Sequence, residues 1–190
     1  MTVRPILQIG DPRLREPAEV VDAGKIADPE VQGLVDDLID TMRDANGAGL
    51  AAPQIGVGLR VVVLEVNDNP RYPYKPPIPL TVAINPTIEP LNDELVEINE
   101  GCLSVPLRGN VFRFVSVAVS YLDRTGQRHD EVMRGLTAGT WQHECDHLDG
   151  TLFVDRVEDP TTLTTWAEFE RHHRAAFIER ITAFNQRMGA

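Results

Sequence analysis

The chain has 190 residues, a formal net charge of −11 and a sequence pI of about 4.8. This acidity argues against a general nucleic-acid binder, whose phosphate contacts require Lys and Arg, and no stretch approaches the roughly 20 apolar residues that span a bilayer. The two cysteines, Cys102 and Cys145, make no disulfide framework, and the N-terminus shows no signal-peptide pattern, so we expect a cytoplasmic protein without a membrane partner.

The first predicted helix covers about residues 29–46. Asp28 followed by Pro29 supplies an N-cap and a first-turn residue, and Gly47 can end the helix in a left-handed conformation. Apolar residues recur at three- and four-residue steps and predict one buried face: Val31, Leu34, Val35, Leu38, Ile39 and Met42. Residues 67–79 contain five prolines, which predicts a surface loop within one domain.

Strand-like runs follow this loop and precede further helices. The β-branched segments at 60–66 and 81–85, the second ending at Pro86, are predicted strands, as are 111–122 and a hairpin return over 128–133. A helix over 136–148 ends at Gly150, and a last helix begins at Asp159–Pro160. This order of elements predicts an α+β fold with mainly antiparallel sheets.

The sharpest local signal is the sequence His143-Glu144-Cys145-Asp146-His147. Residues four apart share a helix face, so both imidazoles can reach one metal ion, and Glu144 can act on a water as general base. A chance helix with two surface histidines would give the same pattern. The identity of a third ligand therefore decides the class of protein.

Spacing alone leaves several residues as candidates for the third metal ligand. Phe153 stands where the metzincin pattern requires a histidine, which disfavours that class. Glu168 or Glu170 could serve a thermolysin-like peptidase, although the simpler interpretation is the solvated face of the last helix. Cys102 offers a thiolate suited to zinc or ferrous iron, unless it is a buried core thiol. Cys145 is expected to be packed in the core.

Three segments together resemble the motifs of the peptide deformylase family. They are Gly-Ala-Gly-Leu-Ala-Ala-Pro-Gln at 47–54, Glu-Gly-Cys-Leu-Ser at 100–104 and Gln-His-Glu-Cys-Asp-His at 142–147. The resemblance covers about residues 1–158. It implies a single catalytic domain over 1–190, with antiparallel sheets around a central HExxH helix, an N-terminal helix and a C-terminal helix at about 160–188.

The resemblance also implies a reaction and its residues: hydrolysis of the N-formyl group from the first methionine of new proteins, releasing formate. Glu144 would be the general acid/base, with Gln54 and the backbone N–H of Leu103 as oxyanion donors. The implied ligands of one divalent metal, usually Fe2+ but also Zn2+, Ni2+ or Co2+, are Cys102, His143 and His147. The implied wall of the substrate groove, where glycine permits close backbone approach, is Gly47, Ala48, Gly49 and Leu50.

Two departures from the family pattern bear on the site. The segment after Val105–Pro106 is about one residue shorter than in common members, so either Arg108 or Arg113 could take the supporting roles of arginines there. Gly139 and Thr140 stand where bulkier aliphatic residues often line the pocket for the substrate's first side chain, and a small and a polar residue alter that lining.

The last predicted helix carries a small positive charge. Residues 161–190 carry four arginines and three glutamates, a formal balance of +1. In bacterial relatives this helix can dock on the ribosome, and the alternative is packing on the body through Trp166, Phe169 and Phe177.

The competing functions are an HExxH metallopeptidase using Glu168 or Glu170 and a non-catalytic metal-binding homologue, which would need no general base.

Overall fold

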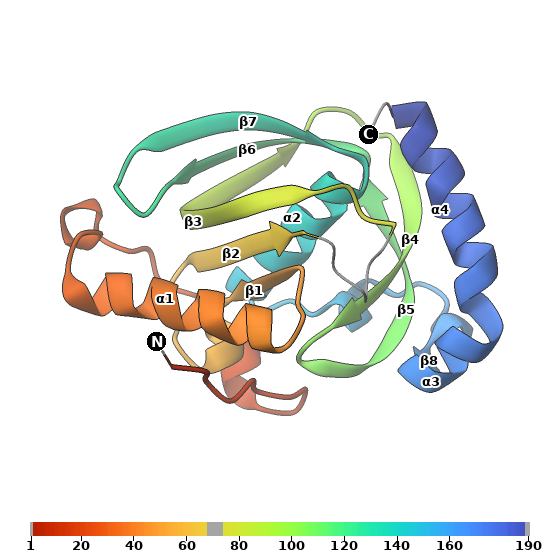
Figure 1. The fold of residues 1–190 in the computed structure, drawn as a ribbon, viewed down its shortest axis with the longest axis horizontal. Helices are drawn as coiled ribbons and strands as arrows, with labels where there is room; N and C mark the ends of the chain where they lie inside the picture. Colours follow the sequence, from red (N-terminus) through yellow and green to blue (C-terminus); the bar gives the residue numbers. More distant parts are fainter. Residues whose placement is uncertain (1, 68–73, 189–190) are drawn as a thin grey trace.

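The computed structural model describes residues 2–67 and 74–188, which form two antiparallel sheets and the helices between and around them. The larger sheet has the strand order β1 (Gly49–Ala51), β2 (Val61–Val66), β3 (Ile78–Pro90), β6 (Ser116–Leu122), β7 (Arg128–Arg134). The smaller sheet has the order β4 (Leu95–Cys102), β5 (Val105–Phe114), β8 (Thr164–Thr165). The predicted α+β class with antiparallel sheets is confirmed (Figure 1).

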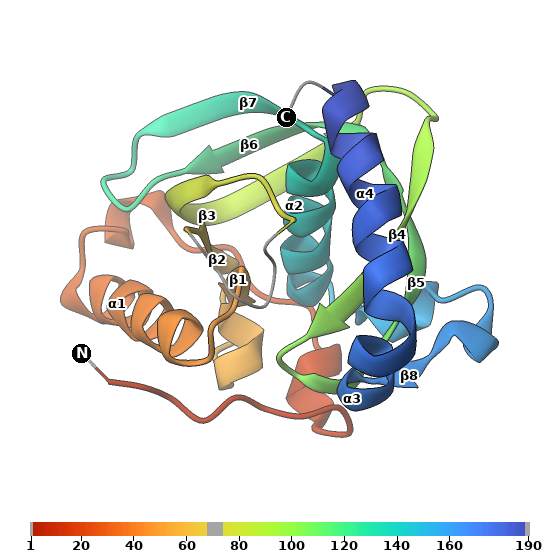
Figure 2. The ribbon, with the colours of Figure 1, turned by 45° about the vertical axis from the view of Figure 1, so that its right-hand side comes forward.

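Helix α2 (Gly135–Leu148) stands between the two sheets, as Figure 2 shows. It contacts β1, β3 and β7 of the larger sheet and β5 of the smaller one. Trp141, Cys145 and Leu148 of this helix belong to the core shared with the larger sheet, so the predicted packing of Cys145 is confirmed. Burial raises the pKa of the Cys145 thiol to about 12. Gly150 ends the helix as predicted, and it does so in a left-handed conformation with a φ of 70°.

Helix α1 (Pro29–Asp44) covers the other face of the larger sheet (Figure 1). It begins as predicted with Asp28 at the N-cap position, although the Asp28 side chain makes no capping hydrogen bond. The prediction for its end is wrong, because Asn46, with a φ of 51°, takes the left-handed conformation. Gly47 serves close packing instead: a Cβ there would lie 2.9 Å from Leu103 Cδ1.

Strand β3 runs through Pro86, where the sequence predicts its end. The pairing of β3 with β6 shifts between Ile84 and Thr87, so a bulge accommodates the proline. Asn85 adopts a φ of 53° at this bulge, and its amide bonds the backbone N and O of Val21, at 2.8 Å each. These side-chain bonds fix a conformation that would otherwise end the strand.

The predicted strand over 111–122 is wrong in one respect: it is two strands in different sheets. β5 ends at Phe114 and β6 begins at Ser116, with the buried Val115 between them. The chain thus crosses from the smaller to the larger sheet here, and the N–H of Gly135 at the start of α2 donates to the Val115 carbonyl at 2.8 Å.

The C-terminal helix begins later than predicted. Asp159 caps only a 3-10 turn, Pro160–Thr162, and β8 then pairs with β5. The helical segment starts with α3 (Trp166–Glu168), passes through a π-helical turn at Phe169–His173 and continues as α4 (Arg174–Met188). It lies outside the smaller sheet (Figure 2) and buries four residues against β4 and the start of α2: Phe169, Phe177, Ile181 and Phe184.

The proline-rich segment predicted as a surface loop, residues 67–79, falls partly outside the described residues. Its end is described: β3 already begins at Ile78, and Tyr74 and Lys75 lie against the candidate site. Among the helices of the described ranges, none combines the length and the apolar composition that crossing a membrane requires.

Candidate metal centre

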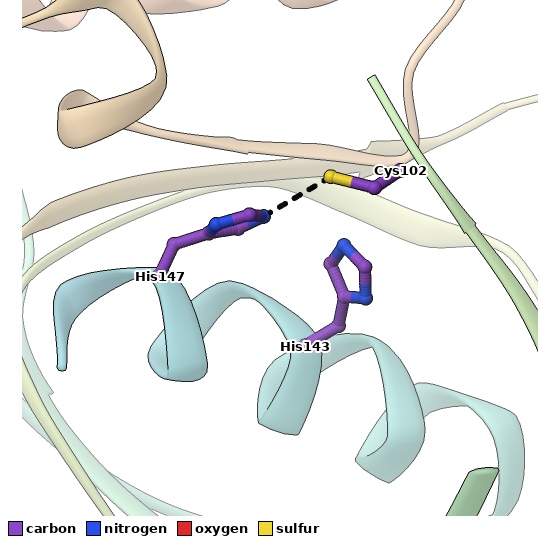
Figure 3. Close-up of side chains that lie close together, drawn as sticks. All are labelled: Cys102, His143 and His147. Atoms are coloured by element: carbon purple, nitrogen blue, oxygen red, sulfur yellow. Dashed lines mark hydrogen bonds between the residues drawn. The ribbon is translucent and has the colours of Figure 1, made fainter. Parts of the chain in front are cut away.

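Three side chains from two elements converge beside α2 and could hold a metal ion. Cys102 ends strand β4, whereas His143 and His147 lie one turn apart on α2 (Figure 3). One ligand atom from each residue lies within 4.8 Å of the other two, and Cys102 Sγ is 3.3 Å from His147 Nε2. All three residues were singled out from the sequence, and the fold brings all three together.

A buried network of ion pairs orients the imidazole of His143. Its Nδ1 donates to Glu100 Oε2 at 2.9 Å, which leaves Nε2 as the ring atom available to a metal. Arg113 donates to both oxygens of Glu100, at 2.7 and 2.9 Å, and also to Asp146 at 2.6 Å. Although burial acts in the opposite direction, Arg113 and His143 hold the pKa of Glu100 well below its usual value. The carboxylate is therefore ionised and fixes the imidazole.

Glu144 points into the pocket beside these candidate ligands, with the residue 4% exposed. Its Oε2 has no hydrogen-bond partner within the described ranges, and burial raises the pKa of its carboxyl group. Gly49 of β1 packs directly on this carboxylate: a Cβ at Gly49 would lie 2.6 Å from Glu144 Cδ. A buried carboxylate with an unused oxygen suits a group that takes and returns a proton.

Gln54 approaches the centre from the 3-10 turn that follows β1 (Ala52–Ile55). Its Nε2 lies 3.5 Å from Cys102 Sγ and 3.1 Å from Ser104 Oγ, while its Oε1 accepts the N–H of Ala51 at 2.9 Å. This last bond orients the amide so that its NH2 group faces the thiol. Leu103 follows Cys102 and lines the same pocket, as do Gly47, Ala48 and Gly49. Leu50 is buried in the core behind them and does not line the pocket.

The two arginines left open by the sequence have different surroundings. Arg113 belongs to the buried network of ion pairs that orients His143. Arg108, 1% exposed, lines the pocket itself and donates to Asn99 through Nε at 2.7 Å, and to the Asn99 carbonyl at 2.8 Å. Its guanidinium lies 4.3 Å from the ring centroids of both Trp166 and Phe169, so the C-terminal segment covers it.

The other third ligands considered from the sequence are placed elsewhere. Glu168 and Glu170 are about half exposed and pair within their own segment, with Arg171, His172 and Arg174. The ring of Phe153 is buried and stacks beside His143, 6.4 Å between centroids. In the described part of the chain, the cluster with metal-ligand spacing contains Cys102 as its third member.

The donor set fits a divalent transition metal. A thiolate and two imidazoles are ligands that zinc and ferrous iron accept, and three protein ligands leave a coordination position open, as catalytic sites require. Although burial opposes it, the neighbouring imidazoles lower the pKa of Cys102 well below its usual value, which favours the ligating thiolate. The fold and the site thus define an HExxH protein in which two histidines and a cysteine could hold a metal ion.

Comparisons with known proteins identify the family. The family model described as polypeptide deformylase matches residues 3–162. Peptide deformylase 2 of Ralstonia nicotianae is 47% identical over 176 residues, 90% of this chain and 98% of that protein. A Met-Ala-Ser-bound class I type b peptide deformylase from Acinetobacter baumannii has a TM-score of 0.79 at 39% identity, covering 82% of this chain and 99% of that one. The chain therefore belongs to the polypeptide deformylase family and is a hydrolase that removes the N-formyl group from newly synthesised proteins.

Several residues that build the site have no role predicted from the sequence. Glu100 lies in one of the three motifs, and the structure connects it through Arg113 to Asp146. The acidic residues next to motif ligands were a usable signal, because metal-bound histidines commonly donate to carboxylates. Lys75 also lines the pocket but gives no sequence signal, since it lies within the proline-rich segment 67–79, outside every motif.

Proposed function

We propose that Cys102, His143 and His147 hold one divalent metal, Fe2+ as the first candidate and Zn2+, Ni2+ or Co2+ as substitutes, at which a formyl group is hydrolysed. The observation that carries this proposal is the approach of the three donor atoms to within 4.8 Å beside the buried Glu144. A bound divalent cation supplies Lewis acidity, lowering the pKa of water and polarising a carbonyl. The remaining steps belong to side chains and backbone groups of the protein.

Glu144 is the proposed proton carrier. It takes the proton of the water that attacks the formyl carbon and passes it to the leaving amine, so that formate and a free N-terminus result. Its buried position and its raised pKa support both halves of this role, because the carboxyl group must accept a proton and then return it. Orientation of the carboxylate comes from contact with Gly49.

Gln54 and the backbone N–H of Leu103 are the proposed donors to the oxyanion that develops on the formyl oxygen. Each such donor is worth roughly 3 kcal/mol in the transition state. The Gln54 amide is already fixed through Ala51, so little reorganisation is needed. Gly47, Ala48 and Gly49 are the proposed wall of the groove, with Leu50 packed in the core behind them, and because β1 is an edge strand of the larger sheet, an extended peptide can pair with it.

The proposal extends to the setting of the reaction. One catalytic domain spans residues 1–190, acts in the cytoplasm and takes N-formylmethionyl nascent peptides as substrate. Contact with the ribosome through the C-terminal helix would have to use its outer face, because Phe177, Ile181 and Phe184 are buried on the body. Arg171 and Arg187 are exposed on this helical segment and could face an anionic partner.

The experiment that tests this function measures formate release from formyl-Met-Ala-Ser by anaerobically purified, iron-loaded protein, beside the variant Cys102→Ala. The variant removes one of three ligands, so we expect loss of at least about tenfold in metal affinity and of nearly all formate release. Metal content by elemental analysis and formate by an enzymatic assay are the two readouts.

Cys145→Ala is the matched control, since it removes the other thiol of the chain from a core position. This control should keep its metal and its activity. Formate release that survives Cys102→Ala would contradict the proposed ligand set and favour a different third ligand. Absence of release by the wild type with one metal bound per chain would support the non-catalytic alternative.

A second prediction concerns Gly49→Ala. The added Cβ would displace the Glu144 carboxylate, and a displacement of about 1 Å in a catalytic group can reduce the rate about a hundredfold. We expect formate release to fall by about that factor while the metal content stays at the wild-type level. Gly33→Ala in α1 is the control, because a Cβ there meets nothing within 4 Å, and its activity should be unchanged. Equal rates for both variants would show that Gly49 does not position Glu144.

A further inference from the structure

The N-terminal segment bonds both parts of the chain that carry the proposed oxyanion donors. The N–H of Leu7 donates to the carbonyl of Gln54 at 2.8 Å. Gln8, the next residue, donates through its side-chain Nε2 to the carbonyl of Leu103 at 3.0 Å. Two consecutive residues of one extended segment therefore connect the 3-10 turn that follows β1 with the connection between β4 and β5.

The Gln8 amide spans the gap between the N-terminal segment and the β4–β5 connection. Besides the bond to Leu103, its Nε2 donates to the carbonyl of Ile6 in its own segment, at 3.3 Å. The N–H of Ile9 then donates to the carbonyl of Ser104 at 2.7 Å. Both carbonyls of the connection are thus held from outside the hairpin, and a substitution of the Gln8 side chain removes only the bond to the first of them.

The hairpin connection does not have the conformation that strand twist favours. It consists of two residues, Leu103 and Ser104, between the paired Cys102 and Val105. The turns that suit the twist of a two-residue hairpin place the first of these residues at a positive φ, and neither Leu103 nor Ser104 adopts one. The pairing of the strands also shifts between Gly101 and Cys102. Contacts from the N-terminal segment therefore supply a constraint that the hairpin itself does not.

The constraint on the Leu103 carbonyl reaches the Leu103 N–H. Because peptide planes are rigid, only two torsions about one Cα separate the carbonyl of a residue from its N–H, so a fixed carbonyl limits the directions that the N–H can take. A donor to a developing oxyanion contributes most when it is aimed before the reaction. Leu103 lines the pocket, whereas Gln8 is exposed and does not line it. Gln8 can therefore act on the reaction only through Leu103.

We propose that Gln8 is a positioning residue, which holds the Leu103 carbonyl and thereby aims the Leu103 N–H at the oxyanion that develops on the formyl oxygen. The inference rests on the proposed function, because it concerns the placement of a donor to that oxygen. An interaction that strengthens only in the transition state raises kcat and leaves KM almost unchanged. Loss of the Gln8 amide therefore lowers kcat, while KM and the metal content stay near their wild-type values.

The test measures kcat and KM for formyl-Met-Ala-Ser with iron-loaded Gln8→Met, which keeps the length of the side chain and lacks an N–H donor. We expect kcat to fall about tenfold, a part of the roughly hundredfold to thousandfold loss that follows removal of one oxyanion donor, and KM to stay within about twofold. Gln8→Lys restores an N–H donor and should recover most of kcat. Gln127→Met is the matched control, because Gln127 is exposed between β6 and β7, and its kcat should be unchanged.

A second variant tests whether Gln8 acts through the Leu103 N–H. Leu103→Pro removes that N–H, and proline suits the first central position of a turn with a negative φ there. Residues that act through one group have effects that do not add. We therefore expect Gln8→Met to lower kcat about tenfold in the wild-type background and about twofold or less when it is combined with Leu103→Pro. A metal content of one per chain verifies that each variant keeps its site.

Two results would overturn this inference and leave the deformylase function intact: a Gln8→Met protein with the wild-type kcat, or an equal loss of kcat in both backgrounds. A loss confined to KM, or one that Gln8→Lys does not recover, would also contradict it. Absence of formate release by the wild type would overturn the proposed function and the inference with it.

Discussion

Replacement of Glu144 by Gln is expected to leave the metal in place and to reduce formate release by about a thousandfold, within the range that general acid–base groups contribute. Gln keeps the size of the side chain and its contact with Gly49, but it cannot accept a proton from water. Because Glu144 is not among the three proposed ligands, the metal content should stay at one per chain. The measurement is single-turnover formate release together with metal analysis.

The control for this variant is Glu89→Gln, an exposed carboxylate on β3, which should leave both quantities unchanged. A Glu144→Gln protein that keeps most of its rate would contradict the assignment of the base. Loss of metal together with rate would instead make Glu144 a ligand or an essential support of one. The two readouts therefore separate proton transfer from metal binding.

The elements with strong local patterns were predictable, and those whose course depends on distant contacts were not. Helix α1 starts at the predicted Pro29, because the Asp-Pro pair and the apolar stripe act locally. Strand β3 passes through Pro86 because the Asn85 side chain hydrogen-bonds to the backbone of Val21, 64 residues away in sequence. Strand β4, which carries Glu97, Asn99 and Glu100, was not predicted, since its polar residues obscure the alternation that signals a strand.

The site shows the same division. Motif spacing together with the family resemblance predicts the three candidate donors and Glu144. The fold brings the donors together, and Cys102, His143 and Glu144 line one pocket. The roles of Arg108 and Arg113 could not be assigned from the sequence, because both lie on β5 and only their tertiary contacts distinguish them. Arg113 faces α2 and reaches the proposed ligand His143 through Glu100, whereas Arg108 faces the pocket and the C-terminal aromatic rings.

The largest expected effect on stability comes from the substitution Arg113→Met. Arg113, with its side chain 2% exposed, joins Glu100 at 2.7 Å and Asp146 at 2.6 Å. Because Arg156 also pairs with Asp146, Glu100 is the carboxylate that depends most on Arg113 for charge compensation. Removal of Arg113 leaves an uncompensated buried charge, which costs about 3–5 kcal/mol in the free energy of unfolding. Urea unfolding in the presence of a chelator measures this loss without a contribution from bound metal.

Two further variants make the expectation for Arg113 specific. Arg128→Met breaks the pair with Asp130 on the surface, where the side chains are 68% and 60% exposed, and should change the free energy of unfolding by about 1 kcal/mol or less. Arg113→Lys keeps the charge but loses the planar fork that reaches both carboxylates, so a loss between those of Arg128→Met and Arg113→Met is expected. An Arg113→Met protein as stable as Arg128→Met would mean that Glu100 is neutral or solvated in the folded state, because Asp146 keeps its pair with Arg156. The ionised carboxylate that orients His143 would then be absent, and with it the physical reason why this imidazole presents Nε2 to a metal.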